Sequence, residues 1–256
     1  MAAATLRYAV LLTSRAALKP GPLSAALAPV LKKPAVDLAP ALRRCWGLVD
    51  LDAEEAFARA QAEALTAKGL PALAVPAALV EEVPAAEAVT ALPHPPRTPT
   101  LAAAATFTRR QTKTVKEEQG PSTGERALGI GITLATGLPP SLFGVGGKKL
   151  VEKTVEQSDQ VSYLEIYAGA PSRRLRLEAG DFDYSCLGPA MGFDAFGNFK
   201  KLVQGLSESG ARLNGGAKAL LAGQPQRALG YEGLEDLERE ARWLFTLAAL
   251  GKDPDA

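Results

Sequence analysis

The sequence predicts an α+β protein, in which a small α/β unit precedes an antiparallel sheet that is closed by C-terminal helices. Two observations predict this order. A strand–helix–strand pattern lies between Leu48 and Val75, and two strands with alternating apolar and polar residues lie between Val161 and Glu178. Helical periodicity follows the second pattern and continues almost to the end of the chain.

The N-terminal unit, residues 1–92, is organised around a βαβ pattern. Leu48–Leu51 is a short apolar run, and the stretch Asp52–Glu55 has the residue types of a capping box, with Asp52 as the expected N-cap. Gly69 suits the residue after this helix, and Leu70–Val75 is a second apolar run. Strands joined by a single crossover helix run parallel, so we expect these two strands to be parallel.

A third strand is expected at Arg7–Thr13, which is an apolar run of strand length. A small sheet with helices on one face would result, and it resembles a ferredoxin-like unit or a part of one. We expect the helix before Gly69 to bury a stripe made of Phe57, Ala60, Ala64 and Leu65.

Residues 93–126 read as a linker. The run from Pro93 to Pro96 contains three prolines, which favours an extended chain. One possible strand lies within this stretch, at Thr106–Lys116, where threonines alternate with basic and apolar residues.

The third segment, residues 127–256, contains an antiparallel hairpin. Alternation places one set of side chains inward and one set toward solvent on each strand, and a Gly/Pro turn joins the strands. The inward set is Leu164, Ile166, Leu175 and Leu177; the solvent-side set is Tyr163, Glu165, Tyr167, Arg174, Arg176 and Glu178.

Helices follow the hairpin. One is expected to bury Phe196, Phe199, Leu202, Val203 and Leu206, with Asp194 as its N-cap, and the last runs from about Leu234 to Leu250. A sheet closed by a C-terminal helix resembles a pleckstrin-homology-like unit or another small barrel. This resemblance rests on element order alone, so it implies no function.

Charge and composition narrow the classes of partner. The chain has 256 residues, 47% apolar and 22% charged, with a net charge of +1. No global field therefore favours nucleic acid or an anionic membrane. The uncharged stretch Ala127–Gly147 contains six glycines and the pair Pro139-Pro140, so we interpret it as a strand and a loop rather than a membrane span. We expect a soluble cytoplasmic protein.

The residue types that most often carry catalysis are scarce. His94 is the one histidine, and it lies in the proline-rich linker. Cys45 and Cys186 are far apart and have no metal-ligand spacing, so we expect two free thiols and no metal site. The glycine-rich run Leu142–Lys149 fails the phosphate-loop spacing, because Leu142 stands where that motif needs glycine. No cofactor is predicted.

The segment from Asp181 to Asn198 is the one concentrated group of polar and aromatic residues. Its candidate catalytic residues are Asp183, Tyr184 and Cys186, which combine a carboxylate, a phenol and a thiol. Two hypotheses therefore remain open. The first is a non-enzymatic binding or interaction module with a protein partner, and the second is an enzyme or small-ligand-binding protein that uses this segment.

Overall fold

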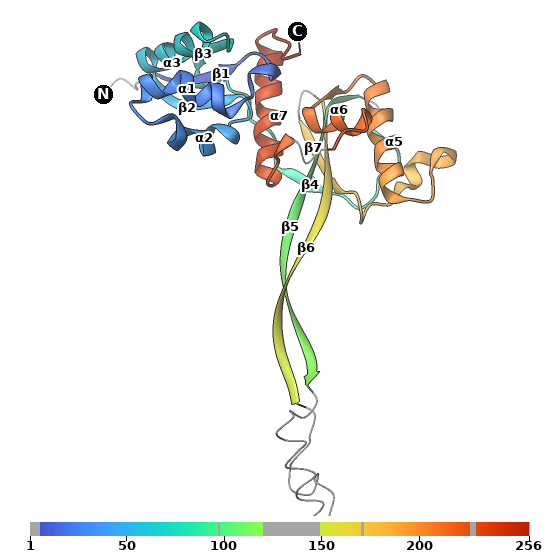
Figure 1. Cartoon of the computed structure of the whole chain (residues 1–256). Coiled ribbons are helices and arrows are strands. Elements are labelled where there is room, and N and C mark those ends of the chain that lie inside the picture. The colour runs from blue at the N-terminus through green and yellow to red at the C-terminus, as the bar shows by residue number, and fades with distance from the viewer. Residues whose placement is uncertain (1–5, 97, 120–148, 170–171, 226–228, 256) are drawn as a thin grey trace, which may run out of the picture. The chain divides into compact units, whose positions relative to one another are not determined.

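The computed structural model describes residues 6–96, 98–119, 149–169, 172–225 and 229–255 (Figure 1). The chain divides into two compact units. The first contains residues 1–107 and 161–256, and the second contains residues 108–160. The boundary predicted from composition, residues 93–126, does not coincide with this division, because residues 93–107 belong to the first unit.

The first sheet of the larger unit contains β1 (Arg7–Leu12), β2 (Leu48–Glu54) and β3 (Ala72–Pro76) in the order β2-β1-β3. Both outer strands are antiparallel to β1, so β2 and β3 point in the same direction, as the βαβ pattern predicts. The helix α3 (Glu55–Ala67) joins them across β1. The two strands that α3 joins therefore lie on either side of β1.

One face of this sheet is covered by α1 (Pro20–Leu31), α2 (Ala35–Arg43) and α3. Val10 and Leu12 of β1 lie in the core that these helices form. On the opposite face of β1, Ala9 and Leu11 belong to a different core cluster. The central strand is therefore buried on both faces, which explains its uninterrupted apolar sequence.

Two details of the α3 prediction are wrong. Phe57 is 40% exposed, and the buried face consists of Ala58, Gln61, Ala62 and Leu65. A stripe of apolar residues cannot identify Gln61 as buried, because glutamine is polar. The side-chain amide of Gln61 donates a hydrogen bond to Asp50 at 2.8 Å, and this bond makes its burial tolerable. Asp52 is not the N-cap, because β2 continues to Glu54 and Asp52 pairs with Arg7 at 2.8 Å.

The second sheet has the order β4-β7-β6-β5-β8. Its strands are β4 (Ala86–Ala88), β5 (Pro99–Gln119), β6 (Lys149–Ala168), β7 (Arg173–Glu178) and β8 (Arg212–Leu213). The predicted hairpin of β6 and β7 is confirmed, with Ile166 opposite Leu175. The small-barrel resemblance is wrong: β4 pairs parallel to β7 and β8 pairs parallel to β5, so the described strands form an open mixed sheet with a short strand at each edge.

Helices cover both faces of the second sheet. On one face, α5 (Ala195–Glu208) and α6 (Gly215–Leu221) pack against Leu164, Ile166, Leu175 and Leu177. On the other face lies α7 (Leu234–Ala249), whose Trp243 shares a core cluster with Tyr167 of this sheet and with Leu11 of the first. Figure 1 shows α7 between the two sheets.

The start of α5 departs from its predicted buried face. Phe199, Leu202, Val203 and Leu206 are buried as expected, but Phe196 is 59% exposed. Asp194 is the N-cap, as predicted, and its carboxylate accepts a hydrogen bond from the Gly197 amide at 2.6 Å. The Phe196 ring, in the first turn of α5, therefore lies outside the core in which the later apolar residues of the helix are buried.

The predicted solvent face of the hairpin is wrong at three of its six residues, where α7 packs against the sheet. Glu165 and Tyr167 are fully buried and Arg174 is 3% exposed. The Glu165 carboxylate accepts hydrogen bonds from Arg174 at 2.8 Å, from Arg176 at 2.8 Å and from the Tyr167 hydroxyl at 2.6 Å. These residues are polar because they form a buried ion-paired network, which alternation alone cannot distinguish from a solvated face.

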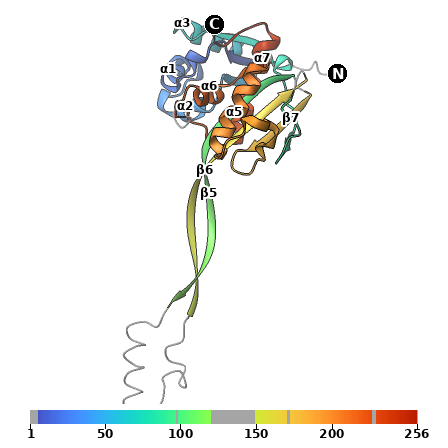
Figure 2. The ribbon, with the colours of Figure 1, turned by 90° about the vertical axis from the view of Figure 1, so that its right-hand side faces the viewer.

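The smaller unit, residues 108–160, contains the remaining lengths of β5 and β6. Figures 1 and 2 both show these strands side by side as a two-stranded ribbon. The possible strand predicted at residues 106–116 is thus part of β5, which is longer at both ends. The uncharged stretch at residues 127–147 and most of the glycine-rich run at 142–149 lie outside the described residues.

The buried network makes Arg174 a test of this fold. We expect Arg174→Met to lower the free energy of unfolding by about 3 kcal/mol, because Glu165 would keep a buried charge with one guanidinium fewer. The matched control is Arg173→Met, whose pair with Glu87 is on the surface, with side chains 60% and 55% exposed. We expect that control to cost under about 1 kcal/mol in urea denaturation. Equal losses for the two variants would contradict the burial of this face.

Candidate functional site

A buried carboxylate on α7 organises the polar centre of the larger unit. Glu240 is completely buried, and four donors reach its two oxygens. The Arg15 guanidinium lies 2.5 Å from Oε1, and the Gly215 amide donates to the same oxygen at 3.0 Å. The Asn214 amide donates to Oε2 at 2.8 Å, and the Tyr231 hydroxyl also donates to Oε2. These bonds offset the large cost of removing a carboxylate from water.

Local sequence explains how two of these donors are positioned. Asn214 is the N-cap of α6, where its side-chain oxygen accepts from the Ala217 amide at 2.8 Å. Its amide nitrogen is then free to reach Glu240. Gly215 follows, and a Cβ at that position would lie 3.0 Å from Arg15 Nη1, so glycine leaves room for the guanidinium.

A second acid holds Arg15 from its other side. Arg15 Nε donates to Asp255 at 2.9 Å, and the Lys218 ammonium lies 2.5 Å from the same carboxylate. Burial alone would raise the pKa of Asp255, but the hydrogen bonds from Lys218 and Arg15 outweigh it and lower that pKa. Burial alone would likewise lower the pKa of Arg15, yet Glu240 and Asp255 raise it, so this guanidinium stays charged.

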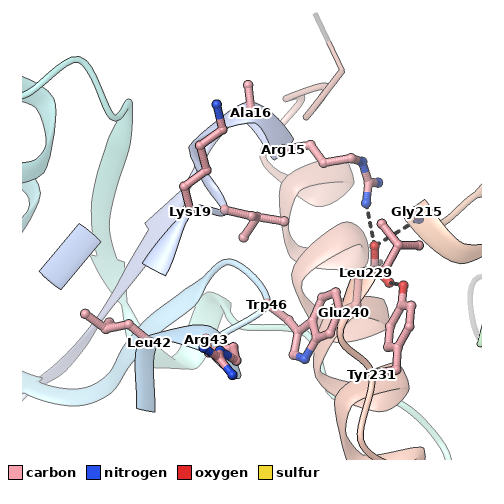
Figure 3. A pocket seen from close by; sticks show the side chains of 11 residues that line it. Arg15, Ala16, Lys19, Leu42, Arg43, Trp46, Gly215, Leu229, Tyr231 and Glu240 are labelled. Carbon is pink, nitrogen blue, oxygen red and sulfur yellow. Dashed lines mark hydrogen bonds and ion pairs between the residues drawn. The ribbon is translucent and has the colours of Figure 1, made fainter. Parts of the chain in front are cut away.

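A cavity of about 250 Å³ opens beside this network (Figure 3). Its lining includes three cations, Arg15, Lys19 and Arg43, and one carboxylate, Glu240. Trp46 and Tyr231 supply an aromatic wall, and their rings stack with centroids 4.2 Å apart and planes 7° apart. In the view of Figure 3, Trp46 lies between Arg43 and Tyr231.

Trp46 has an unusual backbone conformation. It lies in the turn between α2 and β2 with φ of 46°, which is rare for a bulky residue. The next residue, Gly47, has φ of 89°, and a Cβ there would lie 2.3 Å from the ring of Trp243. The Gly47 carbonyl accepts from the Leu12 amide at 2.9 Å, so core contacts on both sides hold the turn in place.

Two residues of the lining each have a buried nitrogen donor with no acceptor among the described residues. Trp46 is only 7% exposed, and its Nε1 is buried without a hydrogen bond. Arg15 Nη2 is buried and unpartnered as well. A guanidinium and an indole N–H can only donate, so these two nitrogens are buried donors without a described acceptor.

The candidates predicted between Asp181 and Asn198 lie elsewhere, around the short helix η4 (Tyr184–Ala190). Asp183 is exposed and caps this helix, accepting from the Ser185 amide at 2.9 Å. Tyr184 is buried, and its hydroxyl donates to the Ala179 carbonyl at 2.9 Å. The segment does bring the side chains of Asp183 and Tyr184 together. Their hydrogen bonds stabilise the junction between the hairpin and α5.

The two cysteines are free thiols, as the sequence predicts. Burial raises the pKa of Cys186, and the Asp183 carboxylate raises it further. A raised pKa favours the protonated thiol at neutral pH, whereas a nucleophilic cysteine needs the thiolate. Cys45 is 4% exposed, and burial raises its pKa as well.

The remaining sequence candidates are dispersed. His94 is exposed in the segment between β4 and β5. Within the ranges that the structure describes, no three His, Cys, Asp or Glu side chains form a group that could hold a metal ion. Over the same ranges, no helix has both the length and the apolar character needed to cross a membrane.

Sequence reasoning missed the residues around the cavity. Arg15, Trp46, Tyr231 and Glu240 come from four segments that no spacing rule relates. Two local signals were present: a tryptophan directly before a glycine at residues 46–47, and the Asn214-Gly215 pair. Comparison with known proteins adds no relative, because no family model, curated protein or solved structure matches the chain.

The environments of the two thiols predict their reactivity. In the native protein at pH 7.5, we expect iodoacetamide to modify Cys186 first and Cys45 only after unfolding, because Cys45 is almost fully buried. The reaction of Cys186 should accelerate as pH rises, since burial raises the pKa of this thiol and the thiolate is the reactive form. Mass spectrometry of tryptic peptides provides the measurement.

Cys186→Ser is the control for this assignment. It should remove the faster reaction and leave Cys45 protected. Labelling of Cys45 at the rate of Cys186 in the folded protein would contradict the structure around the Trp46 turn.

Proposed function

We propose that this protein is a binding module whose small ligand occupies the cavity beside Trp46. The observation that supports this function is the state of Trp46 itself. A non-glycine residue held at positive φ costs about 1–3 kcal/mol, and such residues cluster at ligand clamps and active sites. A buried donor without an acceptor costs about 1–3 kcal/mol more.

The composition of the cavity wall supports the same function. Small-molecule sites combine apolar and aromatic walls with a few placed polar groups. Here Leu18, Leu42 and Leu229 accompany the Trp46–Tyr231 pair, and the charged groups are few. A volume of about 250 Å³ lies just below the usual range for drug-sized ligands, so the ligand is small.

This proposal keeps the binding function expected from the sequence and moves the ligand site away from the Asp181–Asn198 segment. Asp183 and Tyr184 already use their polar atoms in local hydrogen bonds. Cys186 has a raised pKa, which disfavours a nucleophilic role. The cavity, by contrast, is lined by Arg15 and Trp46, each of which has a buried nitrogen that no described residue satisfies.

The two tryptophans make the proposal measurable. The indole N–H of Trp243 is bonded to the Leu12 carbonyl at 2.6 Å, while Trp46 lines the cavity and its indole N–H has no described partner. In ¹⁵N–¹H spectra recorded against a library of small fragments, we expect binding fragments to shift the Trp46 indole signal and leave the Trp243 signal in place. Trp46→Phe assigns the signals, since it removes one of the two.

Two results would count against a ligand in this cavity. The first is a library of several hundred fragments of which none moves the Trp46 indole signal. The second is a set of fragments that bind and shift other signals while the Trp46 signal stays unchanged.

A second candidate function, binding of a protein partner, is favoured by an exposed apolar group. Met191, Phe193 and Phe196 lie within six residues of one another, and Phe193 is fully exposed. Lys201, which donates to the Ala190 carbonyl at 2.8 Å, lies beside them. We propose that this group takes an apolar segment of a partner that carries acidic residues, since exposed apolar groups rimmed by charge mark interaction sites.

This second function is tested with Phe193→Ser, which removes one exposed ring and no core contact. We expect Phe193→Ser to change the melting temperature little. We also expect one protein that the native chain captures to be absent when the variant is used for the capture. That protein, once purified, should bind the native chain at least tenfold more tightly than Phe193→Ser. Leu79→Ser is the matched control, because Leu79 is exposed on another element. Equal binding by Phe193→Ser and the native chain would remove this candidate.

A further inference from the structure

The polar side chains deepest in the cavity wall are bonded to one another. Glu240 has no exposed surface and accepts two donors on each of its oxygens. The Tyr231 hydroxyl donates to Glu240 and lies 3.0 Å from the Asn214 amide nitrogen. Arg15 donates through Nη1 to Glu240 and through Nε to Asp255, and its third nitrogen, Nη2, is buried. These groups therefore have little hydrogen-bonding capacity left for a ligand.

The other polar side chains of the lining are Trp46, Lys19 and Arg43. Trp46 Nε1 is buried, so a ligand in the cavity does not reach its N–H. Lys19 and Arg43 are exposed, and Figure 3 shows their side chains pointing apart, so the two cations do not converge on one group. An ion that entered the cavity would lose its water without gaining a matched partner, and the free-energy cost of that desolvation is large.

The apolar part of the wall remains for recognition. It consists of three leucines and two aromatic rings: Leu18, Leu42, Leu229, Trp46 and Tyr231. Aromatic side chains pack well against other rings in offset or edge-to-face arrangements. An apolar protein cavity of about 150 Å³ is large enough to bind benzene. The volume here, about 250 Å³, therefore suits a molecule of one or two rings.

From this wall and these occupied polar groups we infer that the ligand of the cavity is a small uncharged aromatic molecule, held by its apolar surface. The inference rests on the proposed ligand-binding function and adds the chemical class of the ligand. The free energy gained from apolar contact grows with the area removed from water and needs no charge on the ligand. Charge on the ligand therefore weakens binding.

The test uses three probes of similar shape that differ in charge: toluene, benzoate and benzylammonium. Each is titrated into the full chain at pH 7.5, and binding is followed by the Trp46 indole signal and by calorimetry. We expect toluene to bind at least tenfold more tightly than either ion, because each ion must give up the water around its charge. Added salt should not weaken the binding of toluene, since no ion pair with the ligand is involved.

Variants in the lining separate apolar contact from charge. Leu229 lines the cavity and is 37% exposed, so we expect Leu229→Ala to retain the native melting temperature and to weaken toluene binding three- to tenfold. Leu79→Ala is the matched control, because Leu79 is 49% exposed and does not line the cavity. Arg43→Gln removes an exposed cation of the lining and should leave the affinity for toluene unchanged.

The outcomes distinguish this inference from the function on which it rests. Binding of benzoate or benzylammonium as tight as that of toluene overturns the uncharged class, and so does an affinity for toluene that Leu229→Ala leaves unaltered. If the ions or other fragments shift the Trp46 signal while toluene does not, the inference falls and the proposed function stands. If neither these probes nor the fragment library moves the Trp46 signal, the inference and the proposed function both fall.

Discussion

The buried Glu240 carboxylate is the interaction on which the larger unit depends. A charge without solvent is tolerated only when hydrogen bonds and an opposite charge surround it, and here the donors come from separate parts of the chain. Arg15 follows β1 of the first sheet, while Asn214 and Gly215 begin α6 beside the second. One carboxylate on α7 therefore joins elements from both halves of the sequence, and α7 packs between the two sheets.

The same network shapes the cavity. Arg15 uses Nη1 for Glu240 and Nε for Asp255, which leaves Nη2 without a described partner. Trp46 is held by its stacking on Tyr231, and Tyr231 in turn donates to Glu240. Arg174 in the second sheet also has one unpartnered nitrogen, but it does not line the cavity. Trp46 differs from Arg174 because it lines the cavity and has a positive φ.

Local signals in the sequence predicted much of the fold. The hairpin of β6 and β7 follows from alternation, and its register places Ile166 opposite Leu175. Asp194 caps α5 because an aspartate before a helix satisfies first-turn amides whatever the surroundings. The parallel direction of β2 and β3 follows from the length of one crossover helix. Each of these predictions depends on residues that are close to one another in the sequence.

The sequence by itself determined the elements and the core-facing side of most of them, since periodicity reflects the geometry of one helix or strand. Tertiary structure decided which surfaces meet. Glu165 and Arg174 have the pattern of solvated residues, yet α7, distant in sequence, covers them and makes them a buried pair. The cavity has the same origin: Arg15, Trp46 and Glu240 converge because non-local packing brings them together, and no local rule encodes which distant segments will pack against each other.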